Sequence, residues 1–146
     1  MQVERKVTRD GIKIYNIDDF DGMRNSCNLA AKTLDMINEH VRPGITTDEL
    51  DKICHDFIIL NNATPATLGY RGYPKSSCIS INHVVCHGIP SNKKLKNGDI
   101  LNIDITCILD GWFGDSSRMY IAGQANRKSE RLIQVTHDSL MLGVEQ

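Results

Sequence analysis

The pair Asp110-Gly111 constrains the fold more than any other feature of this chain. Asp-Gly favours the two-residue turn of a β-hairpin, because both positions tolerate a positive φ. The sequence on either side predicts two strands, at about 99–109 and 112–121. Counting outward from the turn pairs Leu109 with Trp112, Thr106 with Asp115, and Asp104 with Ser117.

In this register Asp104 and Asp115 lie on one face of the hairpin as diagonal neighbours, with Cα atoms roughly 7 Å apart. Two carboxylates about 5 Å apart repel each other by roughly 3 kcal/mol at an effective dielectric near 20. This repulsion would raise one pKa by about 2 units, and a divalent cation would remove it. The alternative is a pair of solvated surface aspartates. Ile100, Ile108 and Phe113 share this face, which favours a partly buried site and therefore a metal.

Length and composition restrict the class of protein. A chain of 146 residues fits one domain, and its net charge of −1 gives no sign of a nucleic-acid-binding surface. No apolar run is long enough to span a membrane, and the charged N-terminus MQVERKVTRDG lacks the apolar core of a signal peptide. Five cysteines without C-x-x-C spacing indicate reduced, mostly buried thiols. We therefore expect a cytoplasmic protein.

The hydrophobic pattern predicts an α+β fold with helices on one face of a mainly antiparallel sheet. Residues 1–17 read as a loosely ordered extension, and 18–146 as the folded part. Thr46 and Glu49 have the spacing of a capping box at the start of the second helix. The expected helices are 19–41, 46–60 and one from an N-cap at Ser129, with Leu132, Val135, Leu140 and Leu142 facing inward. The expected strands are 77–81, 84–88, 99–109 and 112–121, after a loop at 63–76.

Several ordered motifs resemble those of type I methionine aminopeptidases, over nearly the whole chain from about residue 17. They are 69–76 (GYRGYPKS), 77–82 (SCISIN), 84–90 (VVCHGIP), 98–104 (GDILNID) and 110–117 (DGWFGDSS). The resemblance implies the pita-bread fold, a two-lobed α+β sheet with an internal pseudo-repeat. It also implies hydrolytic removal of the initiator methionine from nascent polypeptides, with two divalent metal ions (Co, Mn, Fe or Zn).

The resemblance also implies roles for individual residues. Asp104 and Asp115 match two metal ligands, and Asp115 matches the one that bridges both ions. His87 matches a histidine that contacts substrate and stabilises the reacting amide. Tyr70 and Tyr73 match positions that line the pocket for the methionine side chain.

The chain departs from the family pattern at four positions. Thr67 stands where a pocket cysteine is common, and Arg71 and Phe113 each stand where histidine is frequent. His83 replaces a usual glutamate. His83 and His87 would share a face of a strand, which is a weak sign of zinc; the turn at Asn82-His83 favours a structural role for His83.

The family's second half supplies a further metal histidine, two glutamates and another substrate histidine, and this chain has none of that half. A site for two ions needs more donors than two carboxylates. We therefore expect the N-terminal half of a longer enzyme, inactive alone and prone to self-association. Two alternatives are a catalytically inert pita-bread scaffold protein and a related proline-specific metallopeptidase. Retention of both aspartates disfavours the first, and the GYRGYP segment disfavours the second.

Overall fold

The computed structural model describes residues 6–146. The first five residues of the expected extension, which include part of the N-terminal segment considered above for a signal peptide, lie outside the described residues. Within residues 6–17, Val7 and Lys13 form an isolated antiparallel bridge around a turn. No helix in the described part of the chain is both long enough and apolar enough to cross a bilayer.

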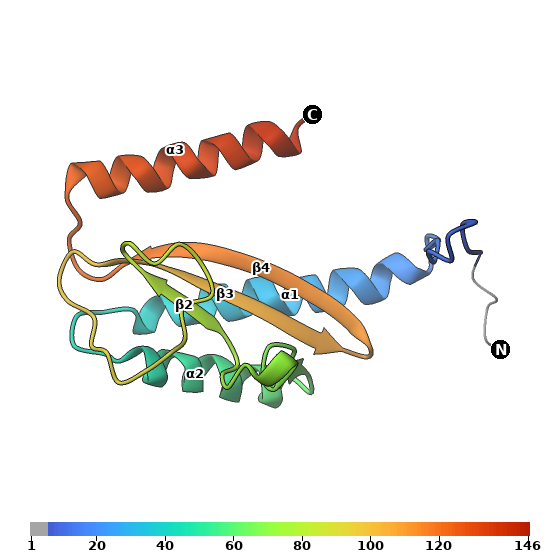
Figure 1. Ribbon diagram of the computed structural model, residues 1–146, viewed down its shortest axis with the longest axis horizontal. Helices are drawn as coiled ribbons and strands as arrows, with labels where there is room; N and C mark the ends of the chain where they lie inside the picture. Colours follow the sequence, from blue (N-terminus) through green and yellow to red (C-terminus); the bar gives the residue numbers. More distant parts are fainter. Residues whose placement is uncertain (1–5) are drawn as a thin grey trace.

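A four-stranded antiparallel sheet forms the centre of the fold (Figure 1). Strand β3 (Ile100–Leu109) pairs along its whole length with β4 (Trp112–Ile121), and its other edge pairs with β1 (Thr64–Pro65) and β2 (Cys78–Ile81). Asp110 and Gly111 both adopt a positive φ in the connecting turn. The register predicted from the turn is confirmed at every pair named above.

Two helices cover one side of this sheet. Helix α1 (Asp19–Ile37) packs against β3 and β4, and α2 (Thr47–Leu60) packs against α1 and the shorter strands. Thr46 and Glu49 form the predicted capping box in full. The core between the helices and the sheet is mainly apolar and includes Leu34, Ile37, Leu50, Ile58, Leu101, Ile103, Ile105 and Cys107. The predicted α+β class is confirmed.

The central hairpin therefore has two different faces. The helix face carries the odd-numbered residues of β3 from Leu101 to Cys107, all buried under α1 and α2. The aspartate face carries the even-numbered residues from Asn102 to Ile108, with Phe113, Asp115 and Ser117 of β4, and none of these seven is buried. Burial on this face is less than expected, since Phe113 is 55% exposed and Asp115 is exposed.

Gly114 allows α1 to come close to β4. A Cβ atom at Gly114 would collide with the backbone of Ser26 and Cys27 on the helix. The Ser26 hydroxyl uses this proximity to donate to the backbone carbonyls of Trp112 (2.8 Å) and Cys107 (3.1 Å). The helix is therefore fastened to the hairpin one residue before Asp115, whose own side chain points to the opposite face.

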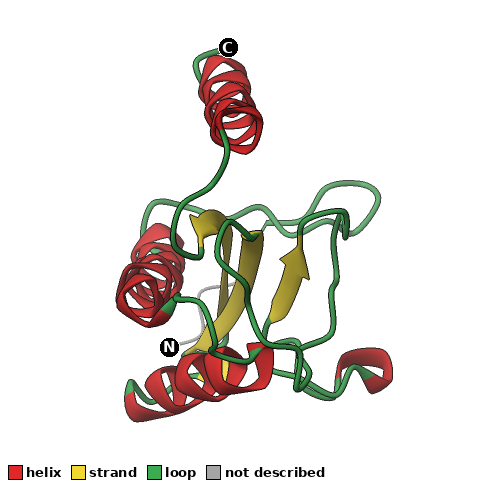
Figure 2. Ribbon diagram, turned by 90° about the vertical axis from the view of Figure 1, so that its left-hand side faces the viewer, coloured by secondary structure: helices red, strands yellow, loops and turns green. Residues whose placement is uncertain are grey.

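The last helix, α3 (Arg127–Val144), stands apart from the rest of the molecule (Figures 1 and 2). Its N-cap is Asn126, whose side chain accepts from the backbone of Lys128 and Ser129, and not Ser129 as predicted. The prediction that its apolar stripe faces inward is wrong, because α3 has no buried residue. Leu132, Val135, Leu140 and Leu142 are each 51–63% exposed.

The predicted strand at 84–88 does not form. Within this segment His87 has a positive φ of 54°, which is incompatible with an extended strand. The predicted turn at Asn82-His83 is present. Two backbone hydrogen bonds still join the segment to β2, from Ile79 N–H to the Gly88 carbonyl (2.8 Å) and from Val84 N–H to the Ile81 carbonyl (3.1 Å).

Candidate functional site

An open cavity of about 750 Å³ lies over the aspartate face. The loop at residues 66–74 forms one side, and residues 87 and 89, with the start of β2, form another. All six residues that the sequence singled out line it: Thr67, Tyr70, Tyr73, His87, Asp104 and Asp115. The structure therefore gathers side chains that lie up to 48 positions apart in the sequence.

Asp104 and Asp115 form the acidic floor of this cavity. Asp104 lies opposite Ser117 and Asp115 opposite Thr106, so the two are diagonal neighbours as predicted. Partial burial raises the pKa of Asp104 above its ordinary range, the nearby charge of Asp115 raises it further, and His87 opposes the shift. The Thr106 hydroxyl donates to Asp115 Oδ1 across the strand pair (3.0 Å) and fixes that carboxylate.

This acidic pair fits a cation only in part. A positive ion would offset both the cost of burying the Asp104 charge and its repulsion by Asp115, the two effects that raise the pKa of Asp104. Among the described residues, however, no group of three or more His, Cys, Asp or Glu side chains is gathered closely enough to hold a metal. Two carboxylates supply fewer donors than the six or so that hard divalent ions prefer.

The two tyrosines have different positions. The Tyr73 hydroxyl lies within hydrogen-bond distance of the backbone carbonyls of Ser77 (3.0 Å) and Gly88 (3.2 Å), so it is engaged by the protein and its ring forms a cavity wall. Burial raises the pKa of Tyr73. Tyr70 is 63% exposed and stands at the rim.

Helix α2 anchors the wall that carries Tyr73. Buried Asp51 accepts three hydrogen bonds at one oxygen, from the backbone N–H groups of Ser76 (3.1 Å) and Ser77 (2.9 Å) and from the Ser77 hydroxyl (2.7 Å). His55 bonds the Ser76 hydroxyl (2.8 Å). The loop is therefore fixed where it passes from Tyr73 into β2.

His87 and Thr67 complete the set. His87 is exposed at the mouth of the cavity, and its backbone is held because the next residue, Gly88, donates to the Ser80 hydroxyl (3.1 Å). The Thr67 hydroxyl is buried and has no hydrogen-bond partner among the described residues. Because this hydroxyl oxygen is inaccessible to solvent, Thr67 lines the cavity through its other atoms.

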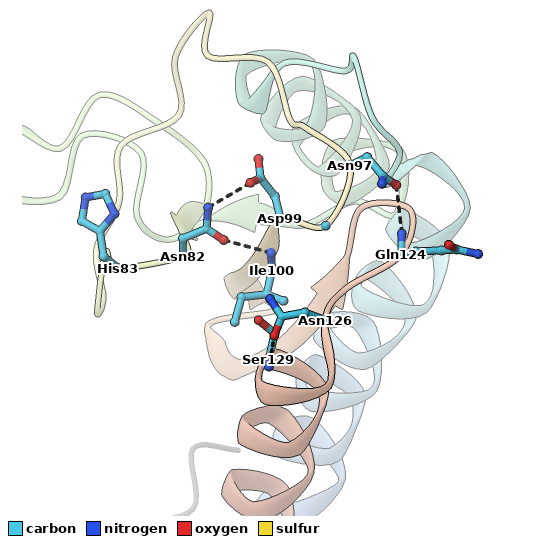
Figure 3. A pocket seen from close by; sticks show the side chains of 9 residues that line it. Asn82, His83, Asn97, Asp99, Ile100, Gln124, Asn126 and Ser129 are labelled. Atoms are coloured by element: carbon cyan, nitrogen blue, oxygen red, sulfur yellow. Dashed lines mark hydrogen bonds between the residues drawn. The ribbon is translucent and has the colours of Figure 1, made fainter.

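His83 does not join this cavity. It borders a separate polar hollow of about 660 Å³ between the end of β2 and the start of α3 (Figure 3). There the Asn82 side chain donates to Asp99 (2.9 Å) and accepts from the backbone of Ile100 (3.1 Å). The weak suggestion of a zinc site at His83 and His87 has no support, because the two side chains line different hollows.

The sequence reasoning assigned no site role to several other cavity residues, among them Cys78, Thr106 and Ile89. One of them, Thr106, carried a readable signal. Thr106 is two positions after Asp104 on the same strand and therefore shares its face, and it also lies directly opposite Asp115 in the predicted register. Cys78 pairs with Asp104 across the neighbouring strands, but that pairing is not visible in the sequence.

Comparison with known proteins decides the family. The profile of metallopeptidase family M24 matches residues 21–146. This chain belongs to metallopeptidase family M24. It is 60% identical over 134 residues to a methionine aminopeptidase of Rickettsia prowazekii (strain Madrid E), covering 92% of this chain and 52% of that protein. It is 52% identical over 136 residues to the methionine aminopeptidase of Salmonella typhimurium (strain LT2), with the same two coverages.

The fold agrees with the sequence match. The crystal structure of the methionine aminopeptidase from Rickettsia prowazekii superimposes with a TM-score of 0.88 at 60% identity, over 88% of this chain and 52% of that one. The predicted resemblance and the pita-bread fold are thus confirmed. The chain spans about half the length of the curated relatives it matches.

Proposed function

We propose that the protein to which this M24 half belongs removes the N-terminal methionine from newly made polypeptides in the cytoplasm. The convergence of Asp104, Asp115 and His87 on one cavity carries the proposal. Similarity to methionine aminopeptidases at 52–60% identity supports the substrate. The retained carboxylate pair disfavours an inert scaffold.

Asp104 and Asp115 are the residues that would hold two divalent ions of Co, Mn, Fe or Zn, with further ligands from outside the described residues. Such ions, when bound, polarise the scissile carbonyl and lower the pKa of water toward neutrality. The Thr106 hydroxyl keeps Asp115 oriented, since it donates to one carboxylate oxygen and leaves the other free.

The remaining cavity residues bind and orient the peptide. His87 lies at the mouth, where it would donate a hydrogen bond to the reacting amide as negative charge develops. Tyr73 and Tyr70 give an apolar wall suited to an unbranched thioether side chain. Thr67 adds to that wall, with its hydroxyl oxygen buried behind the cavity surface.

We further propose that the 146-residue chain has no aminopeptidase activity alone and self-associates. Two carboxylates bind divalent ions weakly without further ligands. The exposed apolar side chains of α3 form an uncovered surface of the kind that drives association.

The test compares this chain with a completed enzyme, defined as residues 1–146 fused to the second half of the Rickettsia prowazekii relative. Both are assayed on Met-Ala-Ser with added Mn²⁺ or Co²⁺, and light scattering gives their size. We expect turnover by the completed enzyme only, and a monomer for it but larger species for the chain alone.

Two results would contradict the proposal. A folded completed enzyme without turnover would remove the methionine aminopeptidase assignment. Turnover by a mass-verified monomer of 146 residues would show that Asp104, Asp115 and His87 suffice, and that the half-enzyme interpretation is wrong.

A further inference from the structure

Arg71 places a positive charge on the wall of the cavity that holds Asp104 and Asp115. It forms no ion pair with any carboxylate among residues 6–146, although acidic side chains line the same cavity. An arginine keeps its charge at every physiological pH. The cavity therefore presents charges of opposite sign, and the positive one has no carboxylate partner among the described residues.

The loop holds Arg71 in a fixed position. Tyr73 N–H donates to the Tyr70 carbonyl (2.9 Å), and Gly69 N–H donates back to the Tyr73 carbonyl (2.8 Å), closing a tight ring around residue 71. Arg71 itself adopts φ 48° and ψ 32°, a left-handed conformation that is uncommon for a residue with a Cβ atom.

The head group of Arg71 is also restrained. Its guanidinium carbon lies 5.4 Å from the centroid of the Tyr70 ring, within range of a cation–π contact. Tyr70 lines the same cavity and is largely exposed, so the stacked pair stands at the rim and not in the core. A stacked guanidinium leaves its N–H edge available to a planar anion such as a carboxylate.

We propose that Arg71 selects peptides that carry a carboxylate close to their N-terminus. The inference rests on the proposed function, because the ligand of the cavity is taken to be the start of a polypeptide. With the N-terminal residue over the acidic floor, the following residues of an extended chain pass the rim, where an aspartate or glutamate side chain meets the guanidinium. Substrates with an acidic side chain at the second residue after the cleaved bond are then preferred to those with a neutral or basic side chain there.

The first experiment measures binding by the 146-residue chain, without catalysis. The probes are C-terminally amidated Met-Ala-Glu-Ser, Met-Ala-Gln-Ser and Met-Ala-Lys-Ser. Amidation removes the terminal carboxylate, so the three peptides differ only in the third side chain, and only glutamate carries a carboxylate. NMR titration of the ¹⁵N-labelled chain at 50 mM salt gives the Kd values. We expect the glutamate peptide to bind about 5-fold more tightly than the glutamine peptide, as for a good exposed ion pair, and less so at 0.5 M salt.

Three variants separate charge from loop shape. Arg71→Lys, Arg71→Gln and Arg71→Glu all keep a Cβ atom, so the backbone cost of the left-handed residue is unchanged. Arg71→Gln should give the glutamate and glutamine peptides equal Kd values. Arg71→Glu should reverse the order in favour of the lysine peptide, and Arg71→Lys should keep part of the preference. The matched control, Arg131→Gln on exposed α3, removes the same charge outside the cavity and should leave the preference intact.

The second experiment measures kcat/KM of the completed enzyme on the same peptides. If the completed enzyme is inactive while the chain prefers glutamate through Arg71, the proposed function fails and the carboxylate site stands. The role of Arg71 is refuted if the enzyme is active and the glutamate and glutamine peptides differ by less than 1.5-fold both in Kd and in kcat/KM. It is also refuted if the chain binds no peptide and the active enzyme has equal kcat/KM for these peptides. A preference that survives Arg71→Gln also refutes it.

Discussion

The two faces of the β3–β4 hairpin are made by alternate residues of the same strands, yet they differ in nearly every physical respect. On the helix face, Leu101, Ile103, Ile105 and Cys107 are all completely buried. On the aspartate face, Asp104 and Thr106 are partly buried and Asp115 is exposed, and together they line a cavity. The helix face holds the fold together, and the aspartate face is left free for a ligand.

This division predicts that substitutions on the two faces have separable effects. On the helix face they should change the free energy of unfolding of the chain. On the aspartate face they should change the chemistry of the completed enzyme and leave stability nearly unchanged. Each experiment below tests that separation, from the largest expected effect to the smallest.

The largest effect is expected at the acidic floor. Asp115→Asn should lower kcat/KM of the completed enzyme by at least about 10³-fold, because several kcal/mol of charge stabilisation depend on the ions it holds. Asp104→Asn should be similarly severe. Since Asp115 is exposed and asparagine can still accept from Thr106, the Tm of the chain should change little. Activity within threefold of the parent at saturating metal would remove the metal role from this hairpin.

The next effect belongs to the helix face. Ile103→Ala should lower the free energy of unfolding by about 2–5 kcal/mol, the range for truncating a buried aliphatic side chain. The matched change on the other face, Phe113→Ala, should cost about 1 kcal/mol or less although it removes more atoms, because Phe113 is 55% exposed. Urea unfolding of both variants measures the two costs. Equal costs would mean that the aspartate face is covered in solution.

A smaller effect is expected at the mouth of the cavity. His87→Ala should lower kcat of the completed enzyme by roughly 10²-fold, as the loss of one transition-state donor does. Bound metal, measured by elemental analysis, should not change, because His87 is assigned to substrate. A large loss of metal in this variant would show that His87 is a ligand instead.

The sequence predicted the hairpin well because its determinants are local. The Asp-Gly turn and the period of two fix which residues face each other, and this register alone placed Asp104 beside Asp115. The capping box at Thr46 is equally local. The family resemblance, not the pattern, supplied His87, Tyr70, Tyr73 and Thr67 for the cavity.

The predictions that failed depended on information outside the local pattern. The strand at 84–88 failed because His87 adopts a left-handed conformation, which no periodicity reveals. The stripe on α3 correctly marks an amphipathic helix, but amphipathicity does not say whether the described chain supplies a partner for it. The free charge of Arg71 is likewise visible only once the loop and the cavity are seen together.

The smallest effect concerns the one buried phenol on the helix face. Tyr120 donates from its hydroxyl to the Leu34 carbonyl (2.6 Å), and burial raises the pKa of Tyr120 to about 12 from an ordinary 10.0. Tyr120→Phe should lower the free energy of unfolding by about 1 kcal/mol at pH 7 through loss of that bond.

The pH dependence of this cost gives a sharper test. Between the unfolded pKa of 10.0 and the folded pKa of about 12, the folded state holds the proton and the unfolded state releases it. Rising pH therefore destabilises the parent chain by about 1.4 kcal/mol per pH unit through this group, and the variant escapes that loss. Buried Cys54 and Cys107, whose pKa values are also raised, affect both proteins alike. Urea unfolding from pH 7 to pH 11 should thus show the variant less stable at first and equal or more stable by about pH 11. If the two proteins instead differ by a constant free energy of unfolding over that range, burial does not raise the pKa of Tyr120. Tyr120 would then be accessible to water, and the helix face would not be sealed as the structure shows.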